Sequence, residues 1–90
     1  MRYFARFDPA RRMRRFYIIG VEQDLFGRHD LWLEWGRAGQ PGTLRRFTFD
    51  QPHDAEKAAA RVVRRRLRRG YEEKPLRSSV VHRSPVASSA

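Results

Sequence analysis

Both tryptophans of the chain lie in the stretch LWLEWGRAG, residues 31–39, and the second is followed directly by a glycine and an arginine. The ring of Trp35 could stack on a nucleobase, and the planar guanidinium of Arg37 fits a phosphate. Gly36 between them lets a backbone or a sugar approach closely. The alternative is that Trp35 fills the protein core, because strand alternation places it on the same face as two leucines of this stretch. The triplet is a candidate nucleic-acid contact.

Positive charge dominates the composition. The 90 residues include 20 basic and 10 acidic side chains, a net charge of +10, and 18 of the basic residues are arginine. A codon bias could explain arginine in place of lysine, but it does not explain the excess of base over acid. Such an excess in a small domain favours a polyanionic partner, of which DNA or RNA is the commonest.

The residue types that perform catalysis show no productive spacing. His29, His53 and His82 are far apart, and no known hydrolase, metalloprotease or nucleotide-binding motif is present. The absence of cysteine excludes a disulfide, a thiolate nucleophile and a cysteine-based zinc site. The carboxylates are scattered singly. We therefore predict no catalytic residues, no metal and no cofactor.

The chain also lacks the features of a membrane protein. Its start, MRYFARFDPA, has no apolar run of signal-peptide length, and no segment approaches a span of about 20 apolar residues. No expected helix pairs a basic face with large membrane-seeking side chains, so an anionic membrane surface is not the expected partner. We expect a soluble, cytoplasmic protein.

Strand patterns fill the first half of the chain. Apolar residues that alternate or are β-branched, separated by turns rich in proline and glycine, predict a small antiparallel sheet of about four strands. The expected strands are RYFARF (2–7), FYIIGV (16–21), LWLEWGR (31–37) and TLRRFTF (43–49). Tyr3 and Phe7 should share one face and Phe4 the other, and Phe47 should share a face with Phe49.

A helix is expected next. Its start is marked by Pro52, its end by Gly70. The apolar positions that recur at helical spacing, and should pack on the sheet, are Ala55, Ala59, Val62, Val63 and Leu67. The basic residues on the opposite, solvent-facing side are Lys57, Arg61, Arg64, Arg65 and Arg68. The arginines of this face, together with Arg45 and Arg46 of the preceding strand, are candidate phosphate contacts.

Arg66 interrupts the pattern, since helical spacing places it among the apolar residues. One interpretation is that its stem covers apolar surface while the guanidinium reaches water near the helix end. The other is that the guanidinium is held at the edge of the sheet to bind a phosphate.

The sequence divides into a folded part and a tail. Residues 1–73 should form one α+β domain, an antiparallel sheet with one C-terminal helix packed across it. Residues 74–90, KPLRSSVVHRSPVASSA, have no periodic apolar pattern and cannot bury enough apolar area to offset their ordering entropy. We predict that this tail is disordered.

The order of these features resembles the WGR domain family. The name-giving triplet is matched by Trp35, Gly36 and Arg37, and FTF, an alanine-bearing helix and RRGY follow it. The strand FYIIGV before the triplet also looks like the family, so the similarity spans about residues 2–72. The family's fold, a small antiparallel sheet with one helix across it, agrees with the one predicted from the residues.

The resemblance implies a function at DNA breaks. In poly(ADP-ribose) polymerases this domain binds strand breaks, and the tryptophan of the triplet packs against the terminal nucleotide. By similarity, Trp35 and Arg37 would meet a DNA end or nick here. The catalytic domain of those polymerases is not among these 90 residues, so a separate protein would supply any effector activity.

Two functions therefore remain to be compared. The first is a stand-alone DNA-binding module that uses Trp35, Gly36 and Arg37 at an end or nick. Its flanking phosphate contacts would be Arg45, Arg46, Arg61, Arg64, Arg65 and Arg68. The second is a protein-interaction module whose basic face docks an acidic partner. Binding to bare DNA at moderate salt distinguishes them.

Overall fold

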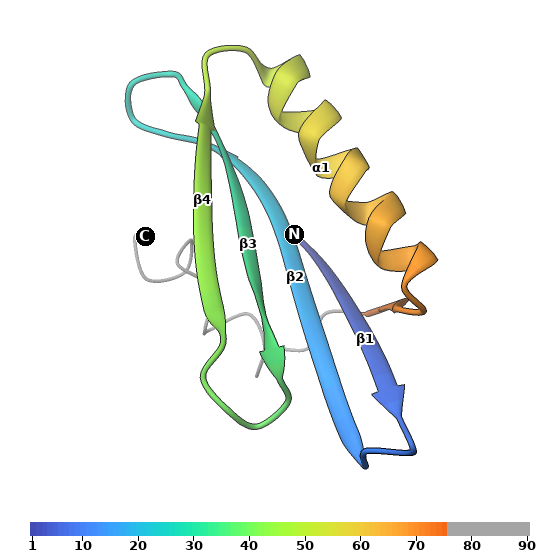
Figure 1. Cartoon of the computed structure of the whole chain (residues 1–90). Coiled ribbons are helices and arrows are strands. Elements are labelled where there is room, and N and C mark those ends of the chain that lie inside the picture. The colour runs from blue at the N-terminus through green and yellow to red at the C-terminus, as the bar shows by residue number, and fades with distance from the viewer. Residues whose placement is uncertain (76–90) are drawn as a thin grey trace.

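The computed structural model describes residues 1–75, in which one antiparallel sheet packs against a single helix (Figure 1). The elements in chain order are β1 (Arg2–Asp8), β2 (Met13–Gln23), β3 (His29–Arg37), β4 (Thr43–Phe49), α1 (Pro52–Arg68) and β5 (Glu72–Lys74). The strand order across the five-stranded sheet is β4-β3-β2-β1-β5. The predicted α+β fold, an antiparallel sheet with one helix across it, is confirmed.

The short strand β5 was not predicted. It pairs with β1, where Phe4 is opposite Glu73. The Arg2 guanidinium donates two hydrogen bonds, of 2.8 and 2.7 Å, to the Glu73 carboxylate. Because β5 ends at Lys74, the sheet extends one residue beyond the predicted domain boundary at residue 73. From residue 76 onward the predicted disordered tail lies outside the described residues.

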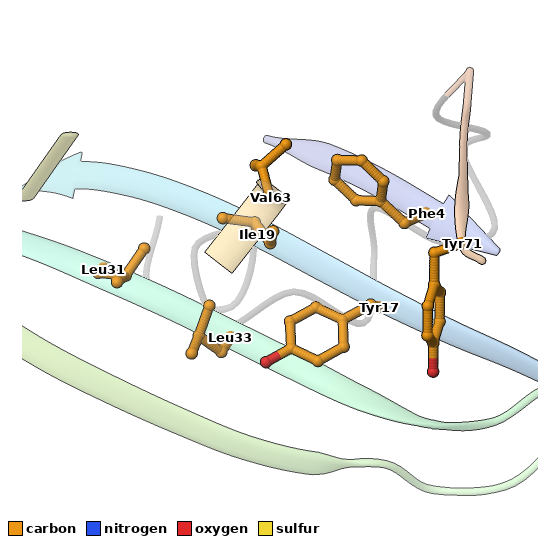
Figure 2. Packing of buried hydrophobic residues seen from close by; sticks show 7 residues of the cluster. All are labelled: Phe4, Tyr17, Ile19, Leu31, Leu33, Val63 and Tyr71. Carbon is orange, nitrogen blue, oxygen red and sulfur yellow. The ribbon is translucent and has the colours of Figure 1, made fainter. Parts of the chain in front are cut away.

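The core lies between α1 and the face of the sheet that it covers (Figure 2). Residues of a strand point alternately to its two faces, and the antiparallel register brings the apolar positions of neighbouring strands opposite one another. Thus Phe4 is opposite Tyr17, and Ile19 is opposite Leu33. The buried cluster consists of Phe4, Tyr17, Ile19, Leu31, Leu33, Val63 and Tyr71.

The end of α1 determines how the last strand reaches the sheet. Gly70 has φ of +88°, a conformation that favours glycine. Its N–H donates to the carbonyl of Leu67, and the N–H of Tyr71 donates to the carbonyl of Arg66, both at 3.1 Å. These two bonds satisfy carbonyls at the helix end in the Schellman arrangement. The chain then turns, Tyr71 enters the core, and β5 can pair with β1.

The helix faces agree with the prediction except at its end. Ala55 and Val63 are buried, and the four predicted arginines of the helix are exposed. Leu67, predicted to face the sheet, is 51% exposed. In this last turn the residue that meets the covered face is Arg66, whose guanidinium lies over the rings of Tyr17 and Tyr71.

Two glycines let strands β3 and β4 meet tightly beside the tryptophan. A Cβ on Gly36 would lie 3.0 Å from the Cα of Gly42 and 3.6 Å from the ring of Phe16. A Cβ on Gly42 would lie 2.6 Å from the carbonyl oxygen of Trp35 and 2.9 Å from the same ring. The two residues therefore leave room for Phe16, which is buried on the face of the sheet opposite α1.

Replacing Gly42 with alanine should destabilise the protein. The new methyl group meets backbone and a buried ring at less than 3.0 Å, so the β3–β4 connection must shift. Overpacking of this kind costs about 1–3 kcal/mol, measurable as the free energy of unfolding in denaturant. The matched control is Gly20→Ala, whose new carbon finds its nearest atom, in Met1, at 3.7 Å. That variant should be as stable as the parent or slightly more so. Equal losses in both variants would contradict this account.

Candidate nucleic-acid interface

Trp35 lies at the edge of the core and not in its centre. It belongs to the face of β3 that α1 covers, as strand alternation predicts, and is opposite Tyr17 of β2. The two rings are stacked, with centroids 5.5 Å apart and planes inclined by 11°. Trp35 remains partly exposed and packs against the buried cluster from outside. One side of the indole is therefore fixed by Tyr17 while part of the side chain stays accessible.

Tyr17 links this tryptophan to the helix end. The Tyr71 ring meets Tyr17 edge-on, with centroids 6.2 Å apart and planes at 80°. The Arg66 guanidinium carbon lies 4.7 Å from the centre of the Tyr17 ring and 5.5 Å from that of Tyr71. Cation–π attraction of this kind favours a guanidinium over an aromatic face. Tyr17, Trp35, Arg66 and Tyr71 form what we call the aromatic–arginine cluster.

This position of Arg66 was not anticipated from the sequence. Its guanidinium lies over two tyrosine rings, and its Nε is buried with no hydrogen-bond partner among residues 1–75. A buried donor without a partner is costly, and here the ring contacts offset part of that cost. The second interpretation, that Arg66 binds a phosphate, stays a prediction.

The hydroxyl of Tyr17 responds to this environment. Burial raises its pKa above the ordinary value, while the positive charges of Arg66 and then Arg65 lower it, and Tyr71 raises it slightly. The net result is a raised pKa. Because the neutral form is favoured in the folded state, the associated stability is present below the ordinary tyrosine pKa. It is lost as the pH rises through the raised value.

A shallow hollow of about 270 Å³ adjoins Trp35. Its lining includes Trp35, Gly36, Arg37, Arg15 and Tyr71. Arg15 and Arg37 are directly opposite each other in the register of β2 and β3. Like charges at opposed positions destabilise a sheet, so this pair favours the presence of an anion. The hollow thus combines an aromatic ring with two guanidinium-bearing side chains.

Arg15 was not selected from the sequence. It is the last residue of the stretch DPARRMRR (8–15), in which it is one of four arginines, and nothing local separates it from its neighbours. Its relation to Arg37 depends on the pairing of β2 with β3, in which Trp35 is opposite Tyr17. Arg15 also donates from Nε to the sulfur of Met13 at 3.1 Å. The signal that could have identified Arg15 is its position two residues before Tyr17, which places the two side chains on the same face of the strand.

The predicted helix contacts form an exposed basic face. All are exposed, and within residues 1–75 none of them takes part in an ion pair. These residues are Arg61, Arg64, Arg65 and Arg68. Their charge is therefore available to a polyanion, at the cost of mutual repulsion when none is bound.

The two predicted arginines of β4 lie on opposite faces of the sheet. Arg45 is opposite Leu33, on the side that α1 covers. Arg46 is opposite Trp32, on the other side, where its guanidinium carbon lies 5.1 Å from the Trp32 ring. It also lies 3.9 Å from a carboxylate oxygen of Asp30. The structure therefore does not bring Arg46 together with the other predicted contacts, because adjacent residues of a strand point in opposite directions.

Gly36 has an internal role in this structure. The sequence suggested that its missing side chain would let a sugar or backbone approach, and the close approach seen is that of Gly42 and Phe16.

Within the described part of the chain, no group of three or more histidine, aspartate and glutamate side chains could hold a metal ion. The same residues contain no helix with the length and apolar character needed to cross a membrane. The features that stand out are the aromatic–arginine cluster, the hollow beside it and the basic face.

Comparison with known proteins agrees with this architecture. The family model described as the WGR domain matches residues 1–78, and the chain belongs to this family, which is associated with nucleic-acid binding. It is also similar to the uncharacterized protein y4dW of Sinorhizobium fredii (strain NBRC 101917 / NGR234). The identity is 37% over 73 residues, which are 81% of this chain and 36% of that protein. The chain thus spans about a third of the length of this relative.

Removing the Arg66 charge should raise the pKa of Tyr17 further. Arg66→Met keeps an unbranched stem but removes the cation that lowers this pKa. The measurement is tyrosinate absorbance against pH, with Tyr3 and Tyr71 replaced by phenylalanine so that Tyr17 alone titrates. Arg64→Met, at an exposed position on the same helix, is the control and should leave the titration unchanged. If the two variants titrate alike, the guanidinium of Arg66 does not lie over Tyr17.

Proposed function

We propose that this chain is a DNA-binding module that prefers ends or nicks of a duplex. The observation that supports this most directly is the partly exposed Trp35 ring beside the opposed pair Arg15 and Arg37. An aromatic ring offers a stacking surface and the guanidinium groups offer donors for a phosphate. The combination suits a terminal nucleotide, which presents a base face and a phosphate at the same place.

The preference for ends follows from the geometry of duplex DNA. In the interior of a duplex each base is covered by its neighbours, whereas an end or a nick leaves a base or sugar face accessible. Trp35 is fixed by its stack on Tyr17 and cannot be inserted deeply without disrupting the core. A ring that is held at the surface suits a nucleotide that is already exposed. No energy is then needed to open the helix.

The basic face would supply affinity that does not depend on sequence. Arg61, Arg64, Arg65 and Arg68 are exposed and without ion pairs in the described residues, and Arg45 lies on the same side of the sheet. Neutralising phosphates with such residues releases counterions and drives binding. RNA ends would offer the same phosphates, so DNA and RNA must be compared directly.

The alternative is that the basic face docks an acidic protein. The exposed charges alone fit this function equally well. Docking of an acidic protein does not explain, however, why an aromatic ring lies beside paired arginines at the hollow. An effector protein is compatible with either function.

The basic face should determine the salt dependence of binding. If about four arginines contact phosphates, the slope of log K against log salt should be near about −3.6, from about −0.9 per contact. The variant Arg64→Gln/Arg68→Gln should flatten this slope and weaken all DNA sequences alike. Arg46→Gln, on the opposite side of the sheet, is the control and should leave the slope unchanged. A slope altered by Arg46→Gln alone would place the DNA on the other face.

Trp35→Ala should remove the preference for ends. Stacking on a nucleotide is worth about 1–3 kcal/mol, so affinity for a linear duplex should fall roughly 5- to 150-fold while binding to a closed circle persists. Affinity is compared on a linear duplex with a 5′-phosphate, the same duplex without it, and a closed circle. Arg37→Ala should weaken mainly the phosphorylated duplex, because its guanidinium then loses a charged partner.

Folding must be measured alongside, since Trp35 also packs on the core. Trp32→Phe, a change on the opposite face, serves as the matched control for loss of an indole. A folded Trp35→Ala protein that binds all three DNAs as the parent does would mean that Trp35 serves packing alone.

A further inference from the structure

The turn between β2 and β3 presents two apolar side chains to solvent. Leu25 is 99% exposed and Phe26 is 82% exposed, more than any other large apolar residue in the described part of the chain. We call these two residues the apolar tip. Burial of such side chains is favourable, so an adjacent pair that is almost fully exposed is a candidate contact site.

The turn is held in one conformation by its own hydrogen bonds. Asp24 Oδ1 accepts from the N–H groups of Phe26, at 2.8 Å, and Arg28, at 2.9 Å. The N–H of Asp24 donates to the carbonyl of Arg28 at 2.8 Å, and Gly27 adopts φ of +83°. The apolar tip is therefore built into a closed turn, and little conformational entropy would be lost when it binds.

Carboxylates outnumber guanidinium groups around the apolar tip. Asp24 lies in the turn, Glu22 precedes it on β2, and Asp30 follows on β3. Two of them have a basic neighbour: Arg28 Nε lies 3.5 Å from Asp24 Oδ2, and Arg46 lies 3.9 Å from Asp30 Oδ2. The guanidinium carbon of Arg28 also lies 5.9 Å from the centre of the Phe26 ring. The register of β3 with β4 brings the end of β4 and the start of α1, with Asp50 and Asp54, to the same end of the sheet (Figure 1). This end of a chain with net charge +10 is thus its acidic end.

The opposite end of the sheet holds a complementary hollow of about 320 Å³. Its lining includes the aromatic residues Tyr3 and Phe7 and the basic residues Arg6, Arg14 and Lys74. It also includes Glu72, which accepts a hydrogen bond from Lys74 at 3.0 Å, and Arg15, which it shares with the hollow beside Trp35. Phe7 is 54% exposed, and the guanidinium carbon of Arg14 lies 5.0 Å from the centre of its ring. We call this the basic hollow.

We propose that the apolar tip of one copy of this chain docks in the basic hollow of a second copy. Leu25 and Phe26 would meet Phe7 and Tyr3, and the excess of carboxylates at this end of the sheet would approach the guanidinium groups around the hollow. The two contact surfaces are different patches at opposite ends of the molecule, so the association is head to tail and does not close after two copies. The excess of carboxylates at this end of the sheet disfavours insertion of the tip into DNA, whose phosphates would repel them.

The contact area is small, and this determines the conditions under which two copies associate. A tip in a hollow buries far less than the roughly 1,200 Å² of a stable interface, so copies free in solution should associate weakly. Copies bound to the same DNA are held at high effective concentration. This amplification rests on the proposed function, whereas the contact itself does not. A copy at a DNA end, with Trp35 on the terminus, would present its tip to the next copy along the duplex.

The first test is cooperativity. On a duplex long enough for several copies, the parent should bind next to an occupied site about tenfold more tightly than alone. Leu25→Ser/Phe26→Ser should bind without cooperativity, yet equal the parent on a duplex that accommodates one copy. Binding of the parent without cooperativity would overturn the proposal. A loss of affinity of the variant on the one-copy duplex would do so too, since the tip would then contact DNA.

The second test traps the contact. Because the chain has no cysteine, introduced thiols are the sole ones present. Phe26→Cys protein mixed with Phe7→Cys protein should form a disulfide-linked pair under mild oxidation, both on DNA and at high protein concentration without it. The matched control mixes Phe26→Cys with Ala60→Cys, at an exposed position of α1, and should give much less.

The outcomes separate the two proposals. If the DNA-free mixture forms the specific disulfide but no DNA is bound, the contact stands and the proposed function fails. If DNA is bound but both mixtures cross-link alike, the head-to-tail contact is wrong while the proposed function stands.

Discussion

The ring of Tyr17 is the point at which separate parts of the chain meet. Trp35 of β3 stacks on it, Tyr71 meets it edge-on after the helix, and Arg66 of α1 lies over it. A residue of a central strand therefore fixes the angle of the indole, the end of the helix and the entry of the last strand. Aromatic contacts of this kind add to the burial of apolar area and restrict geometry more than aliphatic packing does. These contacts therefore hold the surface beside Trp35 in one arrangement.

The same arrangement gives the two ends of the sheet different chemistry. At one end lie the partly exposed indole, the opposed Arg15 and Arg37, and the last turn of α1 with its arginines. At the other lie the apolar tip and its surrounding carboxylates. The net charge of +10 conceals this polarity, since it averages a basic end with an acidic one. A polyanion would meet one end and leave the other available for a different contact.

Local patterns were sufficient to predict most of the fold. Strand alternation placed Trp35 on the covered face, and helical spacing placed Arg61, Arg64, Arg65 and Arg68 in solvent, because both depend only on the geometry of single elements. Strand β5 was missed because its three residues show no alternation of apolar and polar side chains. They reach β1 only because Gly70 redirects the chain after the helix.

Features that depend on contacts between elements were less accessible. The position of Arg15 depends on the strand register and that of Arg66 on the tyrosine rings. Neither can be deduced from the adjacent residues in the sequence. Arg46 differs, since alternation along β4 was enough to separate it from Arg45. Arg46 was predicted as a phosphate contact from its charge alone, without regard to the face of the sheet on which its side chain lies.

The central claim is that the indole of Trp35 meets a DNA end, and fluorescence tests it most directly. In a Trp32→Phe protein, Trp35 is the sole tryptophan, so its emission reports this site alone. The account predicts that a short linear duplex quenches this emission and that quenching saturates at one protein per end. A closed circle at the same concentration of base pairs should leave the emission nearly unchanged. Equal quenching by the circle, or none by the linear duplex while DNA is bound, would contradict the account.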